Sequence, residues 1–259
     1  MNDENCGAIR YPWKFASAKR APGRDRRGTA RPDCYWWRYR LRANAGATLE
    51  RLLQLGERAH FIRGNGDREV VAAFDGQPFA PAMSDEGRAI THWVARQLTS
   101  TQRDFLAALP EQIEMQVEGL GEVNFCHATI RNDEEIFTPL TPQARLETIF
   151  SEARHDTIVC GHTHIQFELK LGNLRILNAG SVGMPYAEQP GAYWLLLDSQ
   201  GYKFQYTPYD GETAALEVRA SGYPQAQAFA DENILKIPTA TEAMTIFERM
   251  AEERWSRDE

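Results

Sequence analysis

The apolar positions of the chain change their spacing at about residue 48, and from there on they follow the two periods of an α/β protein. Apolar residues recur at helical spacing in some segments, and in others they alternate or form the short runs typical of strands. The pattern predicts helices over residues 48–55, 85–98, 101–109, 143–154 and 239–255, with one further helix before the last. It predicts strands over residues 59–63, 112–117, 123–126, 157–160, 166–171, 175–177, 193–197 and 204–207.

Residues 1–47 follow neither period. Trp13, Trp36 and Trp37 argue against a solvated linker, because disordered segments are usually poor in aromatic residues. The segment is also rich in arginine, with Arg10, Arg20, Arg24, Arg26, Arg27, Arg31, Arg38, Arg40 and Arg42. We therefore divide the chain into an atypical segment, residues 1–47, and a domain, residues 48–259.

The composition narrows the class of protein. The 259 residues carry a net charge of −7, so the chain as a whole is not an electrostatic nucleic-acid binder, although the arginine-rich segment alone could form a nucleic-acid arm. No stretch is apolar for long enough to span a membrane, and the first residues do not resemble a signal peptide. The four cysteines, Cys6, Cys34, Cys126 and Cys160, form no CxxC pair, which predicts reduced thiols in a cytoplasmic protein.

Polar side chains follow three of the predicted strands at the point where each strand ends. Asn65 follows the first strand, His127 follows the strand at 123–126, and His162 and His164 follow the strand at 157–160. The carboxyl ends of strands in an α/β sheet gather at one rim, so we expect these side chains to meet there. Imidazoles and an amide oxygen suit borderline divalent metals such as Mn, Fe, Zn or Ni.

Each of these elements also has a plainer interpretation. A single histidine at a strand end is more often a hydrogen-bonded structural residue, and Gly64-Asn65-Gly66-Asp67 alone could be an ordinary turn. Residues 178–183 could be a loop without a role. Cys126 and Cys160 could suggest a zinc site, but cysteine is among the most buried residue types, which favours small buried strand residues.

Taken together in this order, the motifs resemble those of the calcineurin-like metallophosphoesterases. That family carries Asp-x-His, Gly-Asp, Gly-Asn-x-(Asp/Glu), a strand-end His and Gly-His-x-His along the chain. This sequence shows the last three as residues 64–67, His127 and residues 161–164. The later residues 178–185 resemble a Gly-Ser-Val-Gly loop of the small bacterial branch of the family. The resemblance implies a four-layer αββα sandwich with metal ions at one rim.

The resemblance also implies a role for each site residue. Asn65, His127 and His162 would bind the second of two divalent ions, and His164 would bind the first. The two ions would hold the phosphoryl oxygens and supply a hydroxide for in-line attack. The residues that the resemblance assigns to catalysis are Asn65, Asp67 and His127. Asp67 would act indirectly, by orienting Asn65. Three further residues would contact the substrate or support the metal ligands: Gly66, Gly161 and Ser181.

Position 66 departs from the family pattern. Many relatives carry there a histidine thought to protonate the leaving group, whereas this chain has Gly66. The chain would therefore need another acid or a substrate with a good leaving group.

The first two motifs of the family are missing. They should lie before residue 48, and neither Asp25 nor Asp33 stands in the right pattern. Without the bridging aspartate the first ion would keep one ligand, His164. The chain as written is then an impaired remnant or a non-catalytic binding protein, which is the alternative to an active phosphoesterase.

The genetic code offers an explanation for the missing motifs. In a frame shifted by one base, Trp13 becomes a glycine inside a run compatible with Asp-Ile-His-Gly-Asn-Leu. Trp36 and Trp37 become two glycines inside a run compatible with Val-Ile-Gly-Gly-Asp. We therefore hypothesise that residues 1–47 are translated out of frame, with a frame change near residues 45–48; a disordered segment is the alternative. Shifted GC-rich codons also explain the arginines better than a nucleic-acid arm does.

The sequence thus predicts a cytoplasmic, metal-dependent hydrolase of phosphomonoesters or phosphodiesters. The expected partner is a small-molecule or nucleotide phosphoester, with no membrane and no nucleic acid. The residues favour no particular substrate within that class and no oligomeric state.

Overall fold

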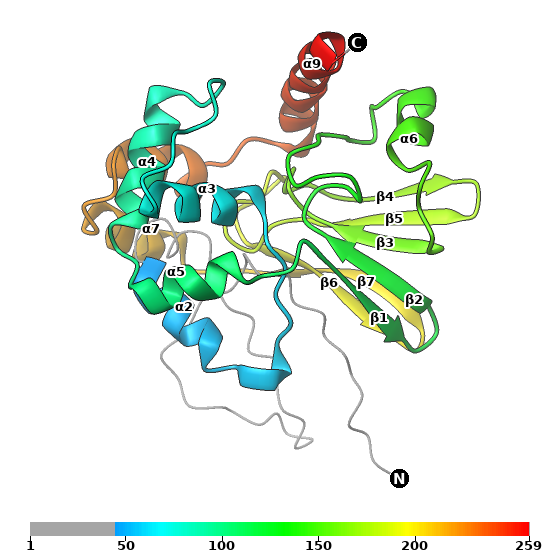
Figure 1. Ribbon diagram of the computed structural model, residues 1–259, viewed down its shortest axis with the longest axis horizontal. Helices are drawn as coiled ribbons and strands as arrows, with labels where there is room; N and C mark the ends of the chain where they lie inside the picture. Colours follow the sequence, from blue (N-terminus) through cyan, green and yellow to red (C-terminus); the bar gives the residue numbers. More distant parts are fainter. Residues whose placement is uncertain (1–44, 259) are drawn as a thin grey trace.

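The computed structural model describes residues 45–258, which form an α/β sandwich of two sheets with helices packed around them (Figure 1). The strands are β1 (Gln112–Val117), β2 (Gly121–Cys126), β3 (Thr157–Cys160), β4 (Gln166–Leu171), β5 (Leu174–Ala179), β6 (Ala192–Asp198) and β7 (Gly201–Thr207). The helices are α2 (Ala45–Leu53), α3 (Asn65–Phe74), α4 (Asp85–Ala95), α5 (Ser100–Ala107), α6 (Gln143–Ile149), α7 (Gly211–Arg219), α8 (Ala226–Ala230) and α9 (Ala240–Asp258), with short turns η1 (Gly56–Arg58) and η2 (Asp231–Leu235). The predicted fold class is confirmed.

The larger sheet has the strand order β1-β2-β3-β5-β4, and β6 and β7 form a second sheet. The three central strands run parallel, with Phe125 opposite Val159 and Cys160 opposite Asn178. The edge strands β1 and β4 are antiparallel to their neighbours. Because β2, β3 and β5 point the same way, the loops that follow them meet at one edge of the sheet.

Strand β3 is buried along its whole length because apolar cores lie on both of its faces. Ile158 and Cys160 belong to one core, which contains residues of α6 and α9. Val159 belongs to the other core, together with Leu195 and Leu197 of β6. Alternate residues of a strand point to opposite faces, so this short apolar run joins the helical layer to the second sheet.

The remaining helices gather around two smaller cores. Leu49 and Leu52 of α2 pack with Val94 of α4 and Leu106 of α5. Residues of α7, α8 and η2 form a separate cluster that also contacts Ile90 of α4. Across the part of the chain that the structure describes, no helix combines the length and the apolar character needed to cross a membrane.

Two predicted elements differ from the structure. Residues 59–63 are not a strand, since no described strand pairs with them; Ala59 N donates back to Gly56 O at 3.2 Å, and Arg63 N donates to Pro110 O at 2.7 Å. Ile62 nevertheless packs into the core between the sheets. The second difference is α3, which begins at Asn65 where the Asn-Gly pair suggested a turn.

Smaller differences concern element ends. Helix α6 ends at Ile149, earlier than the predicted 154, and α2 begins at Ala45, three residues before the predicted start. Ala45 is itself buried in the core of α2, α4 and α5. Residues 1–44, including most of the segment for which a frame change is hypothesised, lie outside the described residues.

The last helix, α9, is held in place by a buried carboxylate. Glu248 accepts hydrogen bonds from the hydroxyls of Thr138, at 2.7 Å, and Thr141. It also pairs with the guanidinium of Arg145, with Nη2 at 2.5 Å from Oε2. A buried charge with this many donors fixes the helix against the loop before α6.

We expect Glu248→Ala to lower the free energy of unfolding by about 3 kcal/mol, because it leaves the nearly buried Arg145 guanidinium without its carboxylate. Glu252→Ala, at an exposed position of the same helix, should change it by less than about 0.5 kcal/mol. Urea unfolding followed by circular dichroism measures both values. Equal effects of the two substitutions would show that Glu248 is not an anchor.

Candidate functional site

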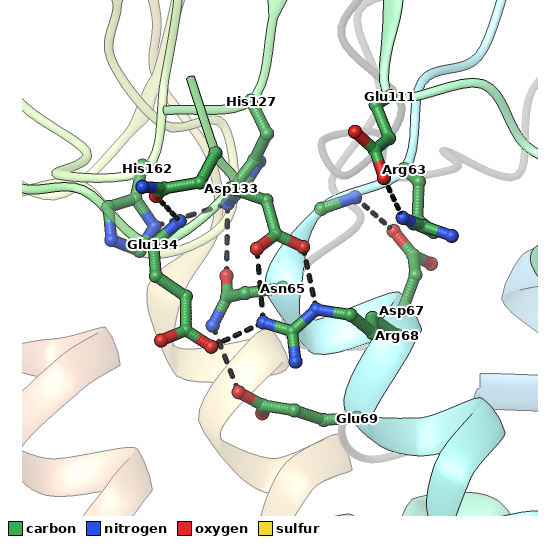
Figure 2. Close-up of polar contacts among 12 residues, drawn as sticks. Arg63, Asn65, Asp67, Arg68, Glu69, Glu111, His127, Asp133, Glu134 and His162 are labelled. Carbon is green, nitrogen blue, oxygen red and sulfur yellow. Dashed lines mark hydrogen bonds and ion pairs between the residues drawn. The ribbon is translucent and has the colours of Figure 1, made fainter. Parts of the chain in front are cut away.

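Side chains from three separate segments meet beside the carboxyl ends of β2 and β3 (Figure 2). Asn65 is the first residue of α3, His127 directly follows β2, and His162 lies in the loop after β3. Nε2 of His127 lies 3.0 Å from Oδ1 of Asn65 and 3.2 Å from Nδ1 of His162. The structure thus brings together three of the four metal ligands that the resemblance implied.

His164, the fourth, has a defined tautomer. Its Nδ1 lies 2.8 Å from the carbonyl oxygen of Met184, and a carbonyl only accepts, so Nδ1 carries the hydrogen. Nε2 is then the nitrogen that can bind an ion, an arrangement common among metal-bound histidines. The ring stacks on Tyr186 with 5.8 Å between the ring centroids and 19° between their planes.

The loop after β3 is strained at both histidines. His162 has φ 61° and His164 has φ 63°, in the left-handed region that residues with a Cβ rarely occupy. Such a conformation costs about 1–2 kcal/mol per residue and persists only where the surroundings enforce it. Strain of this kind is typical of functional loops.

The side chain of Asn178, at the end of β5, braces this loop. Its amide nitrogen donates to the carbonyl of Gly161 at 2.6 Å and lies 3.0 Å from the hydroxyl of Thr163. Its amide oxygen accepts from the backbone N–H of Gly180 at 3.0 Å. Asn178 is completely buried, so these bonds satisfy an amide that water cannot reach. The segment 178–183, which could have been a loop without a role, therefore supports the histidine loop.

Gly161 and Ser181 each make a hydrogen bond that supports the loops around the histidines. The N–H of Gly161 donates to the carbonyl of His127 at 2.9 Å, which joins the ends of β2 and β3. The hydroxyl of Ser181 accepts from the N–H of Met184 at 3.0 Å, and Ser181 is completely buried. Ser181 thereby positions the Met184 carbonyl that holds His164, and its burial keeps it out of reach of a substrate.

Asp67 and Glu69 support Asn65 in two different ways, and the sequence did not predict this difference. Asp67 accepts from the N–H of Gly64 at 2.9 Å and so caps the start of α3. The amide of Asn65 donates instead to Glu69 at 3.3 Å, one helical turn further on. Asp67 thus orients the backbone that carries Asn65, and Glu69 contacts its side chain. Glu69 was missed because its spacing matters only once α3 is known to be a helix.

Burial has the largest effect on the pKa values of these two carboxyl groups. It raises the pKa of Asp67 well above its usual value, against the N–H of Gly64 and the charge of Arg63. Burial also raises the pKa of Glu69, opposed by the hydrogen bond from Asn65. Oδ1 of Asp67 is buried without a hydrogen-bond partner among the described residues.

An ion-pair cluster ties α3 to the loop after His127 (Figure 2). Arg68 contacts Asp133 through Nε and Nη2, both at 3.0 Å, and also pairs with Glu134. These bonds raise the pKa of Arg68. Because Arg68 lies on the helix that begins with Asn65, the cluster fixes the distance between Asn65 and His127.

The site opens into a cavity of about 310 Å³. Asn65, His127, His162 and His164 all line it, together with Gly66 and Gly161. A Cβ atom added at Gly66 would meet nothing within 4 Å, so the backbone at this position faces open space in the cavity. The size is within the range of about 300–1,000 Å³ that is usual for small-molecule sites.

The donor set fits one divalent ion. Nε2 of His127 faces both the Asn65 oxygen and Nδ1 of His162, and a single ring hydrogen cannot serve both contacts well. A cation shared by three lone pairs would satisfy all three atoms at once. Within residues 45–258, no group of three or more His, Cys, Asp or Glu side chains is placed to hold a metal ion. The set described here consists of two imidazoles and the amide oxygen of Asn65.

The cysteines beside the histidines are structural. Cys126 and Cys160 are both buried, as predicted. Burial raises the pKa of Cys126 to about 12, which disfavours the thiolate that a zinc ligand needs.

Comparison with known proteins identifies the family. Residues 43–200 match the family model for the calcineurin-like phosphoesterase superfamily domain, and the chain belongs to that family. A crystal structure of a hypothetical protein from Pyrococcus horikoshii is similar, with a TM-score of 0.60 and 18% identity over 73% of this chain and 79% of that one. A metallophosphoesterase from Sphaerobacter thermophilus gives a TM-score of 0.55 and 16% identity over 73% and 81% of the two chains. A search of curated proteins found no match.

We expect Asn178→Asp to lower the free energy of unfolding by about 3 kcal/mol, because a carboxylate cannot donate to the Gly161 carbonyl and would be buried there. Asn173→Asp, in the exposed turn between β4 and β5, should change it by less than about 0.5 kcal/mol. Urea unfolding of both variants is the measurement. A stable Asn178→Asp variant would mean that the amide does not brace the histidine loop.

Proposed function

We propose that this protein hydrolyses phosphoric monoesters or diesters with the help of divalent metal ions such as Mn, Fe, Zn or Ni. The observation that carries the proposal is the convergence of Asn65, His127 and His162 on the cavity at the carboxyl edge of the sheet. Membership of the calcineurin-like phosphoesterase family supports the reaction class. The substrate would be a small-molecule or nucleotide phosphoester, and we place the protein in the cytoplasm.

The residues of the site would act in distinct ways. Asn65, His127 and His162 would hold one ion, and His164 would contribute to a second. Bound ions would supply a Lewis acid for the phosphoryl oxygens and would lower the pKa of a water molecule so that it could act as the nucleophile. The Arg68 cluster and Asn178 keep the ligands in place, so that little reorganisation is needed when a substrate binds.

The leaving group needs separate consideration. Position 66 carries no side chain, and the cavity around it is open. Without an acid at that position, the site would favour esters whose leaving group departs without protonation. Aryl esters meet this requirement better than alkyl esters do.

A second candidate function follows from the ligand count. Among the described residues, the site offers three donors for one ion, from Asn65, His127 and His162, and only His164 for a second ion. The Asp-x-His motif and the bridging Asp of the family have no counterpart in the sequence as written. A chain with this set would bind phosphoesters weakly and not hydrolyse them. The frame hypothesis would reconcile the two candidates, and it is supported by the family match, which begins at residue 43.

We expect His162→Ala to reduce the Mn²⁺-dependent kcat/KM for p-nitrophenyl phosphate and its bis ester by about 100-fold or more, since it removes a metal ligand. His155→Ala should leave this rate unchanged, because His155 pairs with Glu114 at the outer edge of the sheet. A metal-independent rate, or equal losses in the two variants, would contradict the proposed site. No hydrolysis by the unchanged chain would favour the binding protein.

Sequencing the source gene across codons 1–50 tests the frame hypothesis. We expect an additional base near codon 46, which would restore both missing motifs and the bridging aspartate. Confirmation of the printed frame would refute the hypothesis and leave the second candidate function as the better description of this chain.

A further inference from the structure

One wall of the cavity comes from the last helix of the chain. Phe247, Met250 and Arg254 of α9 all line it, and their spacing of three and four residues places them on one face of the helix. Tyr186 joins them from the loop after β5. None of these residues belongs to a motif of the family, and nothing in the proposed hydrolysis uses them.

This wall is continuous with the metal ligands. The His164 ring stacks on Tyr186, and Tyr186 meets Phe247 edge-to-face with ring centroids 5.6 Å apart and planes at 66°. A group bound beside His164 therefore has aromatic surface next to it. Val70 and Ile90, from α3 and α4, add further apolar side chains to the lining.

Glu69 and Arg254 are the acidic and basic residues of the lining, and each has a partner within the chain. Glu69 accepts from Asn65, and Nη1 of Arg254 donates to the backbone carbonyl of Glu134 at 3.1 Å. The guanidinium of Arg254 is partly exposed and keeps further donors, so the apolar surface is the part of the lining formed by the aromatic and aliphatic side chains named above. A sugar or another highly polar group placed against that part would lose hydrogen bonds to water without replacing them.

The wall is also preformed. Glu248, next to Phe247 in the sequence, is held by Thr138, Thr141 and Arg145. That anchor fixes the rotation of α9 about its axis and so keeps Phe247 and Met250 on the cavity. Apolar surface that is fixed before a ligand arrives contributes more to affinity, because less ordering is needed on binding.

We propose that this wall, defined as Tyr186, Phe247 and Met250, receives the organic part of the phosphoester and selects substrates in which that part is an apolar or aromatic group. The inference rests on the proposed function, because it places the phosphoryl group at the histidines. It goes beyond the proposed function by naming the class of substrate and by giving α9 a role in substrate specificity.

The test is the binding of alkylphosphonates, which are not hydrolysed, to the full chain in the presence of Mn²⁺, measured by isothermal titration calorimetry. n-Hexylphosphonate and methylphosphonate present the same headgroup and differ only in apolar length. We expect the hexyl compound to bind about tenfold more tightly or more, because several methylenes leave water. Equal affinities in the unchanged protein would overturn the inference.

Two neighbouring residues of α9 provide a matched pair of variants. Met250 is 36% exposed and lines the cavity, whereas Ile246 is 48% exposed and does not. Met250→Ala should reduce the hexyl-to-methyl affinity ratio by about threefold or more, and Ile246→Ala should leave it unchanged. Phe247→Ala should reduce it further. Because Met250 is partly exposed, its variant keeps the test valid even if Phe247→Ala does not fold.

The outcomes separate this inference from the proposed function. Binding of both phosphonates without a preference for the longer one would overturn the apolar wall and leave the phosphoesterase standing. A clear preference in a chain that hydrolyses no phosphoester would support the wall and contradict the enzyme. Binding of neither phosphonate would contradict both, and a ratio unchanged by Met250→Ala and Phe247→Ala would overturn the wall.

Discussion

The parallel pairing of β2, β3 and β5 is the constraint on which the site depends. It sets Phe125 opposite Val159 and Cys160 opposite Asn178, so the segments that follow the three strands lie at one edge. Chain positions as distant as His127, His162 and Asn178 thereby become neighbours. The short apolar strand β3 makes this possible, because the cores on both of its faces fix it between the helices and the second sheet.

Hydrogen bonds from neighbouring polar groups hold the histidines of the site in backbone conformations that they would rarely adopt alone. The left-handed conformations at His162 and His164 are supported by the amide of Asn178 and by the carbonyl of Met184. Arg68, with its two carboxylates, fixes α3 against the loop after His127. These contacts within the chain preform the site, which suits the proposed reaction because that reaction depends on the placement of charge.

The sequence predicted the parts of this protein that follow local rules. Strand ends followed by glycine and histidine predicted the edge where His127 and His162 meet, and the apolar run at 157–160 predicted the central strand. It did not predict α3, because Asn-Gly favours a turn and the N-cap residue, Gly64, has no side chain that would mark the start of a helix. Nor could it predict Asn178 or the wall of α9, whose roles depend on which distant segments the fold brings together. Glu69 was missed because its contact with Asn65 exists only when α3 is a helix.

The proposed function requires that Asn65, His127 and His162 hold a divalent ion. Titration of the full chain with Mn²⁺, followed by electron paramagnetic resonance, measures this binding. We expect saturable binding of at least one ion per chain, and we expect His127→Ala to abolish it while circular dichroism shows the fold intact. Absence of saturable binding, or binding that His127→Ala leaves unchanged, would contradict the proposed function.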